Sequence, residues 1–78
     1  MTIDVKYFGM IAEKIGCSEE NLDIPISNDF NLRTFFESKY TVLKQSEYKI
    51  AVNHQFTDSV KESTEIFEIA LLPPFAGG

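Results

Sequence analysis

The sequence has 78 residues, of which 44% are hydrophobic and 24% charged, and its formal net charge is −5. This composition predicts one small folded domain, excludes a disordered chain and disfavours electrostatic binding of nucleic acid, so a basic protein partner is expected. A single cysteine and the lack of a leader-like or membrane-spanning apolar run predict a cytoplasmic protein that is not bound to a membrane.

The first two predicted elements occupy the amino-terminal sixteen residues. Residues 2–8 alternate polar and apolar side chains, which predicts a strand. Its predicted core face carries Ile3, Val5 and Tyr7. Residues 10–15 fit a short helix, and Gly16 is placed to end it.

A second strand and the main helix are expected next. Residues 21–26 alternate again, which predicts a hairpin with the first strand, and Pro25 suits an edge position because it has no N–H to donate. Asn28 or Asp29 is the predicted helix cap. The helix is predicted from an apolar stripe at helical spacing, formed by Leu32, Phe35, Phe36, Tyr40 and Leu43.

The last part of the chain predicts three more strands. Residues 48–52 form the third strand, residues 53–54 a turn, and residues 55–56 a short fourth strand. Residues 65–72 are predicted to close the sheet. In this strand the predicted core face carries Phe67, Ile69 and Leu71.

This order of elements predicts an α+β fold, a ubiquitin-like β-grasp in which one main helix covers one face of a mixed sheet. Residues 1–72 form the β-grasp domain and residues 73–78 an extended C-terminal tail. The first and last strands then lie side by side and parallel. Phe8 and Leu72 are therefore expected close together, on the face without the helix.

The tail is the candidate site of chemistry. Pro73 and Pro74 fix an extended direction away from the sheet, and the six tail residues span roughly 20 Å. Ala76 and Gly77 suit passage through a narrow channel, which leaves the carboxylate of Gly78 as the reacting group. Activation by ATP as an acyl-adenylate allows two outcomes: a persulfide gives a thiocarboxylate, and a lysine amine gives an isopeptide.

A partner is expected to dock at the root of this tail. Phe8, Leu72 and Phe75, with Pro73 and Pro74, form a predicted apolar patch, and exposed apolar patches often mark interfaces. The alternative is that Phe8 tucks under the turn at Gly9-Met10 and that Phe75 is simply mobile.

Two reactive side chains receive no role. His54 has no Cys or carboxylate at a spacing typical of a metal site, so no metal site is predicted. Cys17 lies near Glu19 and Glu20, whose charges disfavour a thiolate. Both residues are expected to be structural or solvated.

The chain resembles the small subunit of molybdopterin synthase, the MoaD family, over nearly its full length. The stretches that carry the resemblance are Val5-Lys6-Tyr7-Phe8-Gly9, Ala12-Glu13-Lys14-Ile15-Gly16, Ala51-Val52-Asn53 and Ala70-Leu71-Leu72-Pro73-Pro74-Phe75-Ala76-Gly77-Gly78. One departure is Glu62-Ser63-Thr64-Glu65, where the family often has an acidic Gly-Asp turn.

The resemblance implies a sulfur carrier without a permanently bound cofactor. An adenylating enzyme of the E1 type, similar to MoeB, activates Gly78 with ATP, and a sulfur donor protein supplies the sulfur for the thiocarboxylate. The tail then enters the large subunit, similar to MoaE, which holds the catalytic residues of a heterotetramer. There the sulfur converts cyclic pyranopterin monophosphate into the dithiolene of molybdopterin, in molybdenum cofactor biosynthesis.

Three alternatives remain open from the sequence. One is a related sulfur carrier for thiamine or tRNA thiolation, although such carriers usually lack the Pro73-Pro74 stem. Another is a ubiquitin-like modifier that forms isopeptides. The third is a binding module whose tail is inert.

Overall fold

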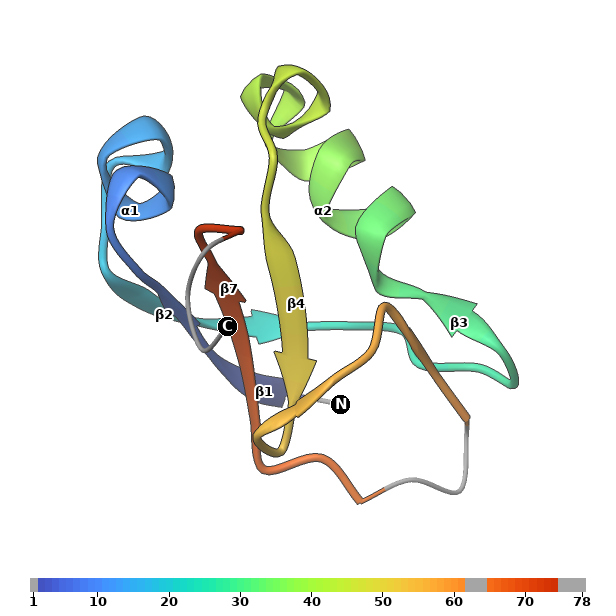
Figure 1. The fold of residues 1–78 in the computed structure, drawn as a ribbon. Helices are drawn as coiled ribbons and strands as arrows, with labels where there is room; N and C mark the ends of the chain where they lie inside the picture. The colour runs from blue at the N-terminus through green and yellow to red at the C-terminus, as the bar shows by residue number, and fades with distance from the viewer. Residues whose placement is uncertain (1, 62–64, 75–78) are drawn as a thin grey trace.

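The computed structural model describes residues 2–61 and 65–74, and within this part a five-stranded mixed sheet is covered on one face by a helix (Figure 1). The sheet contains β1 (Thr2–Tyr7), β2 (Glu19–Asp23), β4 (Lys49–Val52), β5 (Gln55–Phe56) and β7 (Glu68–Leu72), in the order β2-β1-β7-β4-β5. The helices are α1 (Met10–Ile15), α2 (Leu32–Lys39) and the 3₁₀ helix η1 (Thr41–Gln45). Two short strands, β3 (Phe30–Asn31) and β6 (Ser59–Val60), pair with each other.

The pairing of strands is that of the predicted ubiquitin-like β-grasp. β1 and β7 are parallel at the centre, while β2 pairs with β1, and β4 with both β7 and β5, in antiparallel fashion. The carboxyl ends of the first and last strands therefore meet at the same edge, as predicted. Among the described residues, none of the helices has the length and apolar character needed to cross a membrane.

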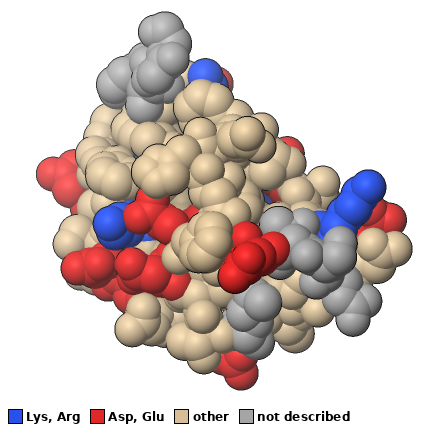
Figure 2. All heavy atoms as spheres, turned by 90° about the horizontal axis from the view of Figure 1, so that it is seen from below, with Lys and Arg blue, Asp and Glu red and all other residues tan. Residues whose placement is uncertain are grey.

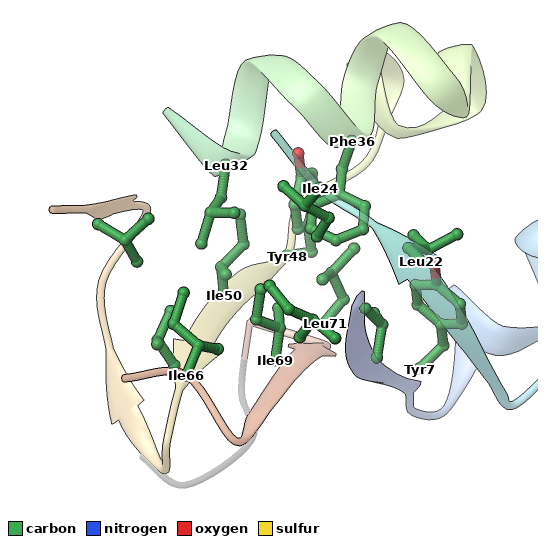
Figure 3. Close-up of a cluster of buried hydrophobic side chains, with 14 of the residues drawn as sticks. Tyr7, Leu22, Ile24, Leu32, Phe36, Tyr48, Ile50, Ile66, Ile69 and Leu71 are labelled. Atoms are coloured by element: carbon green, nitrogen blue, oxygen red, sulfur yellow. The ribbon is translucent and has the colours of Figure 1, made fainter. Parts of the chain in front are cut away.

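The core lies between α2 and the covered face of the sheet (Figure 3). Leu32 and Phe36 point from α2 toward the strands and are fully buried. The strands contribute a matching layer, formed by Ile3, Val5, Tyr7, Ile50, Val52, Ile69 and Leu71. The alternation predicted for β1 is confirmed, because its odd-numbered residues are buried and its even-numbered ones are not.

The predicted hairpin and first helix are also confirmed, with a shift in one strand. β2 pairs with β1 from Lys6↔Glu19 to Thr2↔Asp23, so it begins and ends earlier than residues 21–26. Its end has a local cause, since the Ile26 N–H donates to the Ile24 carbonyl at 2.8 Å and turns the chain around Pro25. Gly16 ends α1 as predicted, with φ of +99°.

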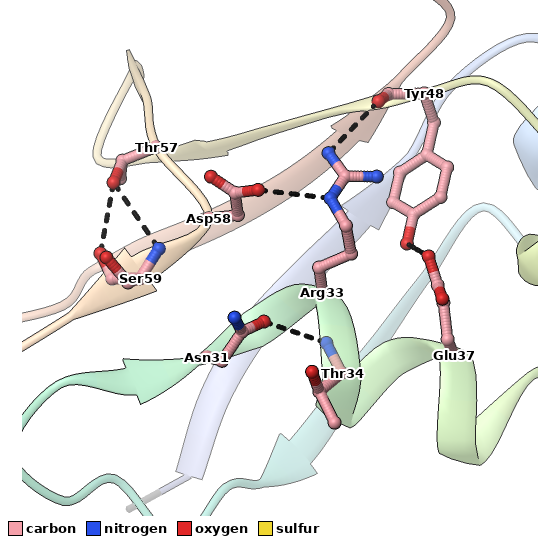
Figure 4. Close-up of polar contacts among 8 residues, drawn as sticks. All are labelled: Asn31, Arg33, Thr34, Glu37, Tyr48, Thr57, Asp58 and Ser59. Carbon is pink, nitrogen blue, oxygen red and sulfur yellow. Dashed lines mark hydrogen bonds and ion pairs between the residues drawn. The ribbon is translucent and has the colours of Figure 1, made fainter.

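The predicted cap of the main helix was wrong. The cap is Asn31, whose side-chain Oδ1 accepts a hydrogen bond from the Thr34 N–H at 2.9 Å (Figure 4), and not Asn28 or Asp29. The cause is β3, which the sequence pattern did not reveal. Pairing of β3 with β6 keeps residues 30–31 extended and delays the helix.

The apolar stripe of the main helix spans two helices. α2 ends at Lys39, and Tyr40 has extended backbone angles of φ −125° and ψ 91°. Leu43 is fully buried as expected, but from η1. Periodicity alone did not reveal this break, because a 3₁₀ turn after an extended residue returns Leu43 to the same core.

The predicted core position of Phe67 was also wrong. β7 begins only at Glu68, and Phe67 is 70% exposed, whereas Ile66 is buried. The side-chain Oδ1 of Asn53 accepts hydrogen bonds from the N–H groups of Phe67 and Glu68, at 2.7 and 3.2 Å. This contact occupies the backbone N–H groups of the residue before the strand and of the first residue in it, and the inside-outside alternation does not extend back to Phe67.

Candidate docking face and tail root

The two predicted patch residues within the described part of the chain lie together. The Phe8 N–H donates to the Leu71 carbonyl at 3.0 Å, which continues the β1–β7 pairing by one residue and places Phe8 beside Leu72. The Phe8 side chain is 44% exposed. Phe8 therefore presents its ring at the surface instead of burying it under the following turn.

A shallow hollow continues from this pair across the uncovered face of the sheet. Its apolar lining comes from Phe8, Ala51, Phe56, Ala70 and Leu72, which we call the docking face. The strand register explains the grouping, because Ala51 is paired with Ala70 in β7 and with Phe56 in β5. Small alanines between larger side chains leave the hollow open.

One side of the docking face is polar. Glu68 forms an ion pair with Lys6 at 2.9 Å, and His54 Nε2 lies 3.6 Å from the same carboxylate. The hydrogen bond and the charge of Glu68 raise the pKa of Lys6. Seen from below, the charged side chains are mostly acidic, in line with the net charge of −5 (Figure 2).

The root of the tail lies against the first helix. Pro73 is buried and Pro74 is exposed. Both line a groove whose other walls come from α1, the last residue of η1 and the two residues after it: Met10, Ile11, Lys14, Gln45, Ser46 and Glu47. The chain thus leaves β7 within this groove, which we call the seat of Pro73 and Pro74.

The remaining predicted site residues are Phe75, Ala76, Gly77 and Gly78, and they lie outside the described residues. The structure thus brings Phe8 and Leu72 together and seats Pro73 and Pro74 beside them. The predicted roles in tail passage and chemistry stay predictions.

The sequence analysis missed Phe56 in the docking face and Glu68 at its polar side. Phe56 is 54% exposed on a two-residue strand, and an aromatic residue two positions after the Asn53-His54 turn was an available signal. Glu68 carried no such signal, since its position beside Lys6 and His54 depends on the register of β7.

Polar clusters elsewhere stabilise the fold. Arg33 on α2 donates to the Asp58 carboxylate at 3.0 Å and to the Tyr48 carbonyl at 3.3 Å, and the Tyr48 hydroxyl donates to Glu37 at 2.8 Å (Figure 4). Burial and the Glu37 hydrogen bond raise the pKa of Tyr48. These contacts join α2 to the strands and bring no nucleophile to a base.

A second cluster joins the hairpin to the end of α2. The hydroxyls of Tyr7 and Tyr40 both donate to one oxygen of Glu20. Burial first, and then the hydrogen bond and charge of Glu20, raise the pKa of Tyr40 to about 12 and also raise that of Tyr7. Cys17 is half-buried, and within residues 2–61 and 65–74 no cluster of His, Cys, Asp and Glu has metal-binding geometry.

No family model matches the chain. Over 83 aligned positions the chain is 29% identical to the molybdopterin synthase sulfur carrier subunit of Caenorhabditis briggsae, covering 100% of this chain and 99% of that protein. The predicted family resemblance is confirmed.

Two solved structures share the fold of this chain. A Pyrococcus furiosus protein, assigned as molybdopterin converting factor subunit 1, superposes with a TM-score of 0.68 at 20% identity, covering 95% of this chain and 98% of the other. SAMP1, a small archaeal modifier protein of Haloferax volcanii, superposes with a TM-score of 0.66 at 17% identity over the whole of both chains. At these identities the structures establish the β-grasp fold.

Proposed function

We propose that this chain is the sulfur carrier subunit of molybdopterin synthase and that Gly78 carries the sulfur as a thiocarboxylate. The observation that supports the proposal most is the position of the docking face, which adjoins Pro73 and Pro74, the residues that precede 75–78 in the chain. A partner that covers Phe8, Phe56 and Leu72 would meet the tail at its root. The full-length similarity to a sulfur carrier subunit supports the same conclusion.

The chemistry begins at the carboxylate of Gly78, which is ionised near neutral pH and is a poor acyl donor. An E1-type adenylating enzyme removes this obstacle when the carboxylate attacks the α-phosphorus of ATP and pyrophosphate leaves. A persulfide of the sulfur donor protein then attacks the acyl carbon and AMP leaves. A second thiol attacks the resulting acyl disulfide, which releases the thiocarboxylate and forms a disulfide from the two protein thiols.

In this proposal the chain delivers sulfur and the large subunit catalyses its transfer. The docking face binds the large subunit, Pro73 and Pro74 project the tail, and Ala76 and Gly77 allow it through a narrow channel. The large subunit, in a cytoplasmic heterotetramer, holds cyclic pyranopterin monophosphate, the acceptor of the sulfur. ATP is consumed by the activating enzyme, and the carrier binds no cofactor permanently.

The intact mass of the chain tests the carrier role. After incubation with the cognate activating enzyme, ATP and a persulfide donor, we expect a gain equal to exchanging one oxygen for sulfur. A variant that lacks Gly78 is the matched control and should show no gain. An unchanged mass for the complete chain would contradict the proposal.

A protein modifier is the second candidate, because SAMP1 of H. volcanii shares the fold over its full length. In that case the activated Gly78 would react with lysine amines. Denaturing electrophoresis of the same reaction, with cell extract added, would then show covalent conjugates that require Gly78. We expect thiocarboxylate without such conjugates.

A further inference from the structure

Pro73 packs closely against the turn that joins β1 to α1. The position beside the Gly9 α-carbon where a side chain would begin is filled by the ring of Pro73. A Cβ at this position would lie 2.9 Å from Pro73 Cγ and 3.7 Å from Pro73 Cδ. Real Cβ atoms do not approach a carbon as closely as the first distance, so only glycine fits while the ring keeps its place.

The backbone of Gly9 supports the same conclusion independently. Its φ of +57° and ψ of −133° belong to a region that residues with an L side chain rarely adopt. This conformation turns the chain from β1 into α1, where the Ile11 N–H donates to the Phe8 carbonyl at 3.1 Å. Gly9 therefore permits both the turn and the close approach of the tail root.

Other contacts hold the seat in place. The Phe8 N–H bond to the Leu71 carbonyl fixes the end of β1 against the end of β7, two residues before Pro73. The Lys14 ammonium donates to Ser46 Oγ at 2.9 Å and ties α1 to the residue after η1. The ring of Pro73 also fixes its own φ, so contact on this ring orients the backbone that follows.

We propose that Gly9 is a positioning residue whose missing side chain lets Pro73 seat on the β1–α1 turn and so sets the direction of residues 75–78. The functional importance of this direction rests on the proposed sulfur-carrier role. Delivery of a reacting group depends on its placement, and a misplacement of about 1 Å can cost roughly a hundredfold in rate. Gly9 acts through Pro73 and touches neither ATP nor the sulfur acceptor.

The chain offers a matched control for Gly9. Gly16, at the other end of α1, also has a positive φ, of +99°, but a Cβ there would meet nothing within 4 Å. Gly9→Ala and Gly16→Ala therefore both place a side chain on backbone with a positive φ, and only the first displaces Pro73. Pro73→Ala and Pro74→Ala form a second pair, since each removes one proline but only Pro73 contacts Gly9.

The direction of the tail can be measured on the isolated full-length chain by pulsed electron resonance between two spin labels. In a Cys17→Ser background, one label is attached at Ser38→Cys on α2 and the other at Ala76→Cys. We expect a shifted or broadened distance distribution for Gly9→Ala, and the background distribution for Gly16→Ala. We expect Pro73→Ala to broaden the distribution more than Pro74→Ala does.

Three results would overturn the inference. A folded Gly9→Ala variant with the background distribution would show that the contact does not set the direction. If Gly9→Ala does not fold, the proline pair decides, and equal broadening by Pro73→Ala and Pro74→Ala would show that proline stiffness alone matters. Equal changes in the Gly9 and Gly16 variants would assign the effect to backbone strain.

The activating enzyme provides the functional readout, on chains with the natural Cys17 and Ala76. We expect Gly9→Ala to lower the rate of thiocarboxylate formation at least about tenfold, through kcat more than KM, and Gly16→Ala to match the unsubstituted chain. An unchanged rate for Gly9→Ala would reject the functional part of the inference. If no chain gains sulfur, the proposed function fails, whereas the spin-label distances still test the seat.

Discussion

The two faces of the five-stranded sheet are built from the same strands but differ in what covers them. On the face under α2, Leu71 and Ile69 are fully buried in the core. On the other face, one residue along the chain, Leu72 and Ala70 line the open hollow with Phe8. A single strand thus contributes side chains both to the core and to the proposed docking face, so substitutions on the two faces should affect different measurements.

The largest loss of stability is expected when a core side chain is removed from the covered face of the sheet. Phe36→Ala empties a fully buried position between α2 and the sheet, and we expect a loss of about 3–5 kcal/mol in the free energy of unfolding. Chemical denaturation measures this loss. Val42→Ala in η1, where the side chain is 40% exposed, is the control and should change stability far less.

A charge on the uncovered side should affect binding instead of folding. Phe8→Asp should weaken binding to the large subunit by about 2 kcal/mol or more, roughly thirtyfold, and change the stability of the isolated chain by less than about 1 kcal/mol. Isothermal titration calorimetry measures the binding. Phe67→Asp is the matched control, because Phe67 is 70% exposed and does not line the docking face. Equal weakening by both substitutions would argue against the docking face.

The hydrogen bonds of the Asn53 side chain are expected to stabilise the start of β7. It accepts hydrogen bonds from two backbone N–H groups and donates to the Glu65 carbonyl at 2.8 Å. Asn53→Gly keeps a residue that tolerates the observed φ of +50° but loses these bonds, and we expect about 1–2 kcal/mol of destabilisation. His54→Gly, at φ of +71°, is the control. A similar loss in both variants would assign the effect to the turn backbone.

Alkaline pH should lower the free energy of unfolding gradually, through the tyrosine hydroxyls that bind Glu20. Burial and Glu20 raise the pKa of Tyr40 from 10.0 to about 12 in the folded chain, so the folded state keeps this proton when the unfolded state has lost it. Stability from this group is therefore complete below pH 10 and is lost as pH rises through 12. The free energy of unfolding should fall in this window, and less steeply in Tyr40→Phe. Identical slopes would contradict the assignment.

Local patterns in the sequence predicted most of the fold. The alternation in β1, the glycine that ends α1 and the Asn53-His54 turn are each specified by adjacent residues, and each was found where expected. The errors have a common cause in long-range contacts. Pairing of β3 with β6 moved the helix cap, and the Asn53 side chain set where β7 begins, about fifteen residues away.

The candidate site was predictable only in part, because some of its residues are brought together by strand register and by an unusual backbone angle. Phe8 and Leu72 follow from the parallel pairing of the first and last strands, which the order of elements predicts. Phe56 depends on the register of a two-residue strand, and the fit of Pro73 against Gly9 depends on a backbone angle of +57°. Neither can be read from hydrophobic alternation.

In the proposed function, Gly78 delivers sulfur to the pterin held by the large subunit. The most direct measurement is a single turnover that starts from the chain thiocarboxylated with ³⁴S, mixed with the large subunit and cyclic pyranopterin monophosphate. We expect the label to appear in the dithiolene of molybdopterin while the chain returns to its carboxylate mass. Label that stays on the chain, or that moves only to a thiamine precursor or to tRNA when these acceptors are supplied, would contradict the account.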